Sequence, residues 1–148
     1  MQFTTTVLAL LAAASASVAN PVPAEASKNM MAAATPQWTI ENFTRTCNGN
    51  DSTCKYSFGI NTNNGQKVTG CNYSVNGKPA SRATYQNIQC GDFRIGSTWS
   101  GQFGAGQGFQ TLSVVKGRQI VYPGYTDKQL VNGKAVKPNQ SYAPQNLP

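Results

Sequence analysis

The sequence of 148 residues has no histidine and only five acidic side chains, and both shortages argue against an enzyme. Histidine is the usual general base near neutral pH, and the Ser-His-Asp and Cys-His nucleophile systems require it. The acids are scattered, so Glu41 and Asp92 remain only as a candidate pair for glycoside hydrolysis. Metal sites built on oxygen ligands need clustered acids as well. The composition therefore predicts a protein with no catalytic residues, no metal site and no cofactor.

Charge of either sign is scarce, at 11% of the chain compared with about 25% in ordinary globular domains. Twelve Lys and Arg residues give a net charge of +7, but they are scattered singly, and the densest group is Lys116-Gly117-Arg118. Nucleic-acid-binding proteins concentrate basic residues on one face or arm, so we expect no nucleic-acid partner. The positive field either serves only solubility or attracts the protein to acidic wall polysaccharide or anionic lipid.

The chain also lacks a hydrophobic run long enough to span a bilayer, which predicts no stable membrane insertion. A short apolar stretch, residues 7–14, is followed by Ser17 and Ala19 at the −3 and −1 positions of a cleavage site before Asn20. This pattern predicts a signal peptide at residues 1–19. We therefore expect a secreted, extracellular protein.

Cysteine is limited to four residues, at Cys47, Cys54, Cys71 and Cys90. In an oxidising compartment an even number of cysteines predicts paired disulfides. The spacings fit neither a zinc knuckle, which needs two to four intervening residues and usually histidine, nor a C-x-x-C redox motif. Three connectivities are possible, and the short loops between flanking strands favour Cys47–Cys54 and Cys71–Cys90.

Helical periodicity is missing from residues 36–148, where apolar and polar residues alternate instead. Tyr56, Phe58 and Ile60, for example, share one face of a half-buried strand. The pattern predicts one secreted all-β domain at 36–148, a small β-sandwich or β-barrel of antiparallel strands, preceded by a flexible Pro- and Ala-rich leader at 20–35.

Strands are also predicted at 110–116 and 119–122, with weaker ones at 129–131 and 134–136. Turn signals occur at Asn64-Gly65, Asn76-Gly77, Pro123-Gly124 and Asn132-Gly133.

Residues 97–110, STWSGQFGAGQGFQ, combine four glycines with three aromatic residues. This segment is either a flexible lip over a pocket or a bulged connection whose aromatic side chains pack into the core. Trp99, Tyr122 and Tyr125 are the candidate ligand-binding residues, because aromatic side chains on rigid turns provide contact area at low entropic cost. The alternative is that they cover the ends of the β core.

Four N-x-[ST] sequons occur, at Asn42, Asn50, Asn72 and Asn139. Asn50 and Asn139 lie in loop-like contexts, and they are the candidate N-glycosylation sites.

Several motifs together resemble a family: WTIENFTRTC at 38–47, CKYSFGI at 54–60, WSGQFG at 99–104, YPGYTD at 122–127 and the closing SYAPQNLP. They resemble a group of small secreted fungal proteins that includes the hypersensitive-response-inducing elicitor (second type) of the rice blast fungus. The resemblance implies an apoplastic effector or elicitor, a compact β-protein that plant cells perceive, with cell death and defence as the output. It carries over the four cysteines as bridges and no catalytic residues.

Two functional hypotheses follow. In the first, the protein is a non-catalytic effector that acts as a monomer through surface recognition in the host apoplast, with a host surface protein or cell-wall polysaccharide as its partner. In the second, it is an extracellular binding module for cell-wall polysaccharide or a small apolar ligand.

Overall fold

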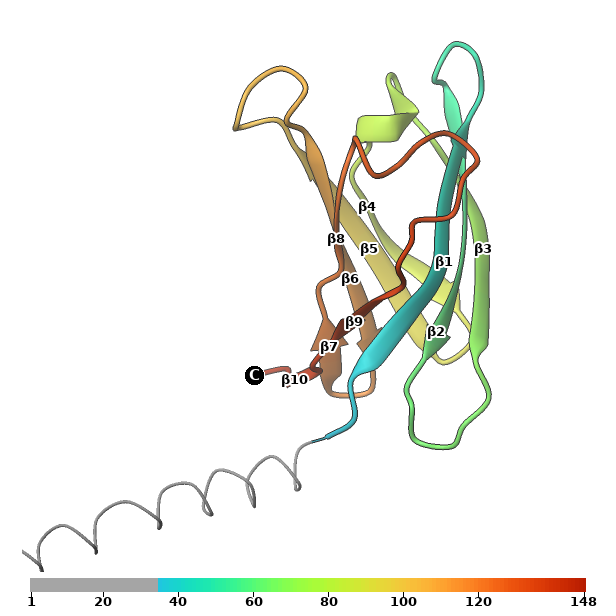
Figure 1. Ribbon diagram of the computed structural model, residues 1–148, viewed down its shortest axis with the longest axis vertical. Coiled ribbons are helices and arrows are strands. Elements are labelled where there is room, and N and C mark those ends of the chain that lie inside the picture. Colours follow the sequence, from blue (N-terminus) through green and yellow to red (C-terminus); the bar gives the residue numbers. More distant parts are fainter. Residues whose placement is uncertain (1–34) are drawn as a thin grey trace, which may run out of the picture. The chain divides into compact units, whose positions relative to one another are not determined.

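The computed structural model describes residues 35–148, which form two antiparallel sheets that share one hydrophobic core (Figure 1). The four-stranded sheet contains, in spatial order, β3 (Thr69–Asn76), β2 (Thr53–Asn61), β1 (Trp38–Cys47) and β9 (Gln140–Tyr142). The six-stranded sheet contains β10 (Gln145–Asn146), β7 (Gln119–Val121), β6 (Phe109–Lys116), β5 (Phe93–Ser100) and β4 (Tyr85–Cys90), and β8 (Gly124–Thr126) also pairs with β6. The prediction of an all-β sandwich is confirmed. The predicted signal peptide and all but the last residue of the predicted leader lie outside the described residues.

Aromatic side chains from both sheets fill the space between them. Phe43 of β1 stacks on Tyr125 of β8 with ring centroids 4.2 Å apart, and Trp38 of β1 meets Phe93 of β5 edge-on at 5.5 Å. Such pairs contribute about 0.5–1.5 kcal/mol beyond the burial of their area. The aromatic residues that alternate along each strand therefore hold the two sheets together.

The two disulfides have different positions in this architecture. Cys47–Cys54 joins residues that face each other on β1 and β2, so it closes the first hairpin. Cys71–Cys90 joins β3, at the edge of one sheet, to β4, at the edge of the other. Both predicted pairings are confirmed, and the second is a covalent link between the two sheets.

Two local predictions were wrong. Pro123-Gly124 is not a turn, because the chain continues along β6 from β7 into β8, and the Leu112 amide donates to the Pro123 carbonyl at 2.7 Å. Proline has no amide hydrogen to give to the ladder, so the regular pairing is interrupted there. The segments 129–131 and 134–136 are not strands, since they belong to a long connection that bonds β1 only at isolated points, such as Val136 N–H to Phe43 O at 2.8 Å.

No helix within residues 35–148 is long and apolar enough to cross a membrane, and the short 3-10 helix η2 spans only Ala80–Arg82.

Candidate functional site

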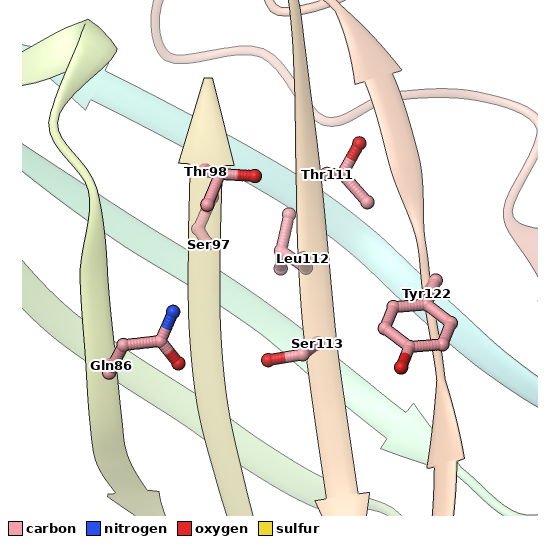
Figure 2. A pocket seen from close by; sticks show the side chains of 7 residues that line it. All are labelled: Gln86, Ser97, Thr98, Thr111, Leu112, Ser113 and Tyr122. Carbon is pink, nitrogen blue, oxygen red and sulfur yellow. The ribbon is translucent and has the colours of Figure 1, made fainter. Parts of the chain in front are cut away.

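An open hollow lies on the face of the six-stranded sheet that points away from the core. We call it the outer hollow, and it has a volume of about 200 Å3. Its lining residues are Gln86, Ser97, Thr98, Thr111, Leu112, Ser113 and Tyr122 (Figure 2). Most of these side chains carry hydroxyl or amide groups, which can both donate and accept hydrogen bonds. The hollow therefore suits a ligand that combines hydrogen-bonding groups with apolar surface.

Strand alternation explains why these polar side chains gather. On β5 and β6 the buried residues Ile95, Leu112 and Val114 point into the core, so their neighbours along each strand point outward. The register then sets Thr98 opposite Thr111 across the two strands. The result is a row of outward hydroxyl groups on adjacent strands.

Gly96 makes room for the Gln86 side chain in this hollow. A Cβ atom at Gly96 would lie 2.4 Å from Gln86 Oε1 and 2.8 Å from Ser113 Oγ. Figure 2 shows the Gln86 side chain reaching from β4 towards β5, with the Ser113 hydroxyl pointing back towards it. A larger residue at Gly96 would displace the amide from the hollow.

Tyr122 forms the aromatic side of the outer hollow. It lies between β7 and β8, opposite Ser113, since Val121 pairs with Val114 and Gly124 pairs with Thr111. Its side chain is 51% exposed. The flanking strands hold its backbone, so the ring is presented from a rigid element and not from a mobile loop.

A second, apolar hollow of about 290 Å3 lies beside the glycine-rich connection between β5 and β6. It is lined by Phe103, Phe109, Gly124, Tyr125, Thr126 and Gln129. Phe103 is 67% exposed and stacks on Phe109 with ring centroids 5.7 Å apart. An exposed aromatic ring of this size is a candidate contact for an apolar group.

Trp99, by contrast, packs against the protein. Its indole N–H donates to Asp127 Oδ2 at 2.9 Å, and the Arg82 guanidinium lies 4.5 Å from its ring. The glycine-rich segment thus combines features of both predictions, because Trp99 packs inward while Phe103 stands in solvent.

The three aromatic residues predicted to bind a ligand do not lie on one surface. Trp99 and Tyr125 pair with the buried Gln110 from opposite sides, so both belong to the inner face of the sheet. Tyr125 is only 2% exposed. Tyr125 lines the apolar hollow, and of the three residues only Tyr122 lines the outer hollow. Sequence reasoning missed Gln86, Thr98, Thr111 and Ser113, although the alternation along residues 93–100 and 110–116 marks the last three as outward.

A buried polar network between the sheets surrounds Gln110. Its amide nitrogen donates to Ser97 Oγ at 2.8 Å and to Tyr56 Oη at 3.0 Å, and its Oε1 lies 3.4 Å from Arg45 Nη1. Arg45 also donates to the Ser81 carbonyl at 3.1 Å and pairs with Asp127 at 3.5 Å. Buried polar groups are costly unless they are bonded, and here they satisfy one another.

Burial changes the ionisation of three tyrosines beside this network. Desolvation raises the pKa of Tyr56, Tyr73 and Tyr85 above the usual value for tyrosine. The hydroxyl groups of Tyr73 and Tyr85 are 2.8 Å apart. Electrostatic interaction with Tyr73 and Tyr56 raises the pKa of Tyr85 further. These phenols therefore stay protonated at neutral pH, and the hydrogen bond between Tyr73 and Tyr85 joins β3 to β4, which the Cys71–Cys90 bridge also links.

Three of the carboxylates in residues 35–148 accept hydrogen bonds from other residues of the domain. Asp51 accepts from the Ser81 amide at 2.9 Å, Glu41 Oε2 accepts from Asn61 Nδ2 at 3.0 Å, and Asp127 holds Trp99. Glu41 belongs to the four-stranded sheet, whereas Asp92 lies in the turn between β4 and β5 of the other sheet.

Asp51 also lies near Cys47 and Cys54, residue types that can ligate metals. Both cysteines are consumed by their disulfide, and metal ligation needs a thiolate, so this group does not fit a metal ion.

All four sequon asparagines are exposed. Asn50 lies in the loop between β1 and β2, and Asn139 directly precedes β9, where its Oδ1 accepts from the Asn42 amide at 2.9 Å. The nitrogen atoms that would carry a glycan remain outside that bond.

Comparison with known proteins gives two matches. The model of the family "Effector TSP1" matches residues 39–147. The chain is also 47% identical, over 151 aligned positions that cover both chains completely, to Effector TSP1 of Hypocrea virens.

Proposed function

The chain belongs to the Effector TSP1 family of fungal effectors, and we propose that it acts in the host apoplast by presenting its folded surface to a host partner. The similarity to a fungal effector along the whole chain carries this proposal. The partner is a host surface protein or a wall polysaccharide, the output is an elicited defence response, and the protein performs no catalysis. Secretion is consistent with the family and with the two disulfides.

The way in which the fold uses its reactive groups supports a surface role. All four cysteines are bridged, and the buried polar groups around Gln110 bond to each other. The carboxylates of Asp51 and Asp127 bond to neighbouring segments. What the domain offers to another molecule is therefore its cross-linked exterior.

Infiltration of purified protein into leaves tests the proposal. Native protein should provoke an oxidative burst and local cell death, and protein that has been reduced and alkylated should provoke much less. A Gln107→Met variant, changed in an exposed loop, serves as the folded control. If the native protein gives no response, the elicitor role is refuted. Equal responses to both forms would show that a linear segment is perceived, and this would refute recognition of the folded surface.

A second candidate function is the binding of a small apolar molecule in the apolar hollow. The observation that favours it is the stacked pair of Phe103 and the partly buried Phe109 at its mouth. Phe103→Ala should weaken binding of an apolar fluorescent dye, whereas Val131→Ala, which removes another exposed apolar side chain, should leave it unchanged. Equal dye binding by both variants would rule out this site.

A further inference from the structure

We propose that the outer face of the six-stranded sheet binds an acidic polysaccharide, a chain of sugars that includes uronates. This inference rests on the proposed function only in the sense that the protein acts through its exterior. The acidic polysaccharide would bind in the outer hollow, with Tyr122 as the stacking residue and Arg94 as the charged contact.

The lining of the outer hollow determines which ligand chemistry fits. Thr98, Thr111 and Ser113 present hydroxyl groups, and Gln86 presents an amide. An apolar ligand would cover these groups without bonding to them, which is costly. A sugar bears hydroxyl groups that donate and accept in the same way, so it can satisfy these groups as water does.

Tyr122 supplies the contact that hydroxyl groups cannot. A pyranose ring has a face of C–H groups, and an exposed aromatic ring offers a flat apolar surface for that face. Because Tyr122 is 51% exposed and held between β7 and β8, stacking needs little rearrangement of the protein.

A second aromatic contact extends the surface along β6. Phe109 points outward from the same strand as Ser113, four residues away, and Phe103 stacks on it. At about 3.4 Å per residue, four residues along an antiparallel strand span about 14 Å. Thr111 lies between them and presents its hydroxyl. An extended chain of several sugars would run along β6 from Phe109 past Tyr122 towards Arg94, whereas a single sugar would reach only one end.

Charge selects an acidic chain over a neutral one. Arg94 is exposed on the same face of β5 as Thr98, where it pairs with Val115 of β6, and no carboxylate lines the outer hollow. In residues 35–148 eleven basic residues stand against four acids. Asp127 is already held by Arg45 and Trp99. A polymer with regularly spaced carboxylates is therefore drawn to this domain and can pair with Arg94 directly.

Binding to immobilised polygalacturonate, compared with a neutral β-glucan, tests the inference at moderate salt. The wild-type protein should bind the acidic polymer and hardly bind the neutral one. Tyr122→Ala should weaken binding about tenfold, as should Arg94→Gln. Tyr122→Phe should retain binding, because the ring remains. The matched control Lys134→Gln removes an exposed charge elsewhere and should have little effect. Circular dichroism and thermal unfolding should show that every variant is folded.

Three results would overturn the inference: equal loss of binding in Arg94→Gln and Lys134→Gln, unchanged binding in Tyr122→Ala, or equal binding of both polymers. The leaf assay separates this inference from the proposed function. If Tyr122→Ala loses the polysaccharide but still elicits a response, the outer hollow is a sugar site and the defence response depends on another surface. If native protein elicits a response but binds neither polymer, the inference fails while the effector role stands.

Discussion

Replacement of Gln110 by methionine tests whether the polar network between the sheets stabilises the fold. Methionine has a similar length, so the cavity term is small. The variant loses the hydrogen bonds to Ser97 at 2.8 Å and to Tyr56 at 3.0 Å, each worth about 1 kcal/mol net. It also removes one acceptor of Arg45, worth about 0.5–1.5 kcal/mol, while Arg45 keeps the Ser81 carbonyl and Asp127 as partners. We expect the free energy of unfolding to fall by about 2–4 kcal/mol.

Urea unfolding followed by tryptophan fluorescence measures this loss, since Trp38 and Trp99 both lie in packed surroundings. Gln107→Met makes the same chemical change in the exposed connection between β5 and β6, and it should change the free energy by less than about 0.5 kcal/mol. If Gln110→Met stays within about 1 kcal/mol of the wild type, the network contributes little and the reasoning is wrong.

Three further predictions concern stability. Replacing both cysteines of Cys71–Cys90 with alanine should lower the free energy of unfolding by about 3.3 kcal/mol, because that bridge closes the longer loop. The same change at Cys47–Cys54, which closes a shorter loop, should lower it by about 2.5 kcal/mol. A larger loss at Cys47–Cys54 in urea unfolding would contradict this order. Burial raises the pKa of Tyr73, Tyr85 and Tyr125 in the folded protein. The stability linked to these raised pKa values is fully present when the pH is below the unfolded tyrosine pKa of about 10, and it is lost as the pH rises above that value. Unfolding free energies measured from about pH 8 to about pH 12 should therefore fall at the alkaline end, and a flat profile would refute the linkage. Gly108→Ala should cost about 1–3 kcal/mol, because its Cβ would lie 2.5 Å from both Trp99 Cζ2 and Asp127 Oδ2, whereas Gly124→Ala meets nothing within 4 Å and serves as the control; equal melting temperatures would show that Trp99 can move aside.

Local patterns in the sequence were enough to predict the fold class and the disulfides. The alternation of Tyr56, Phe58 and Ile60 gives the inner face of β2 correctly, because a strand has a period of two residues. Cys47 and Cys54 flank a short polar loop, and the structure sets them directly opposite each other. In both cases the information lies within a few residues.

Long-range pairing was not predictable in the same way. Nothing in the sequence near Trp38 indicates that it pairs with Tyr142 of β9, or that β3 and β4, joined by one disulfide, belong to different sheets. Those arrangements depend on how whole faces of the sheets pack.

The same limit explains why the candidate site was predicted only in part. Trp99 was predicted as a ligand-binding residue because it lies beside a glycine-rich segment. On β5, however, it lies on the same face of the strand as Ile95 and Ser97, and that face points inward. Pro123-Gly124 has the composition of a turn, and that interpretation missed that the chain runs on along β6 into β8, which sets Tyr122 beside Ser113.

Asp127, one of the few acidic residues, has a structural role. One of its carboxylate oxygens accepts from Trp99 and the other pairs with Arg45, while its backbone amide donates to the Gly108 carbonyl at 2.9 Å. A single acidic residue thereby joins β5, β1 and the end of the glycine-rich connection. The outer face of the six-stranded sheet, by contrast, has Arg94 exposed and no acid in its hollow. Asp127 therefore joins segments of the domain to one another and does not offset the positive charge of the outer face.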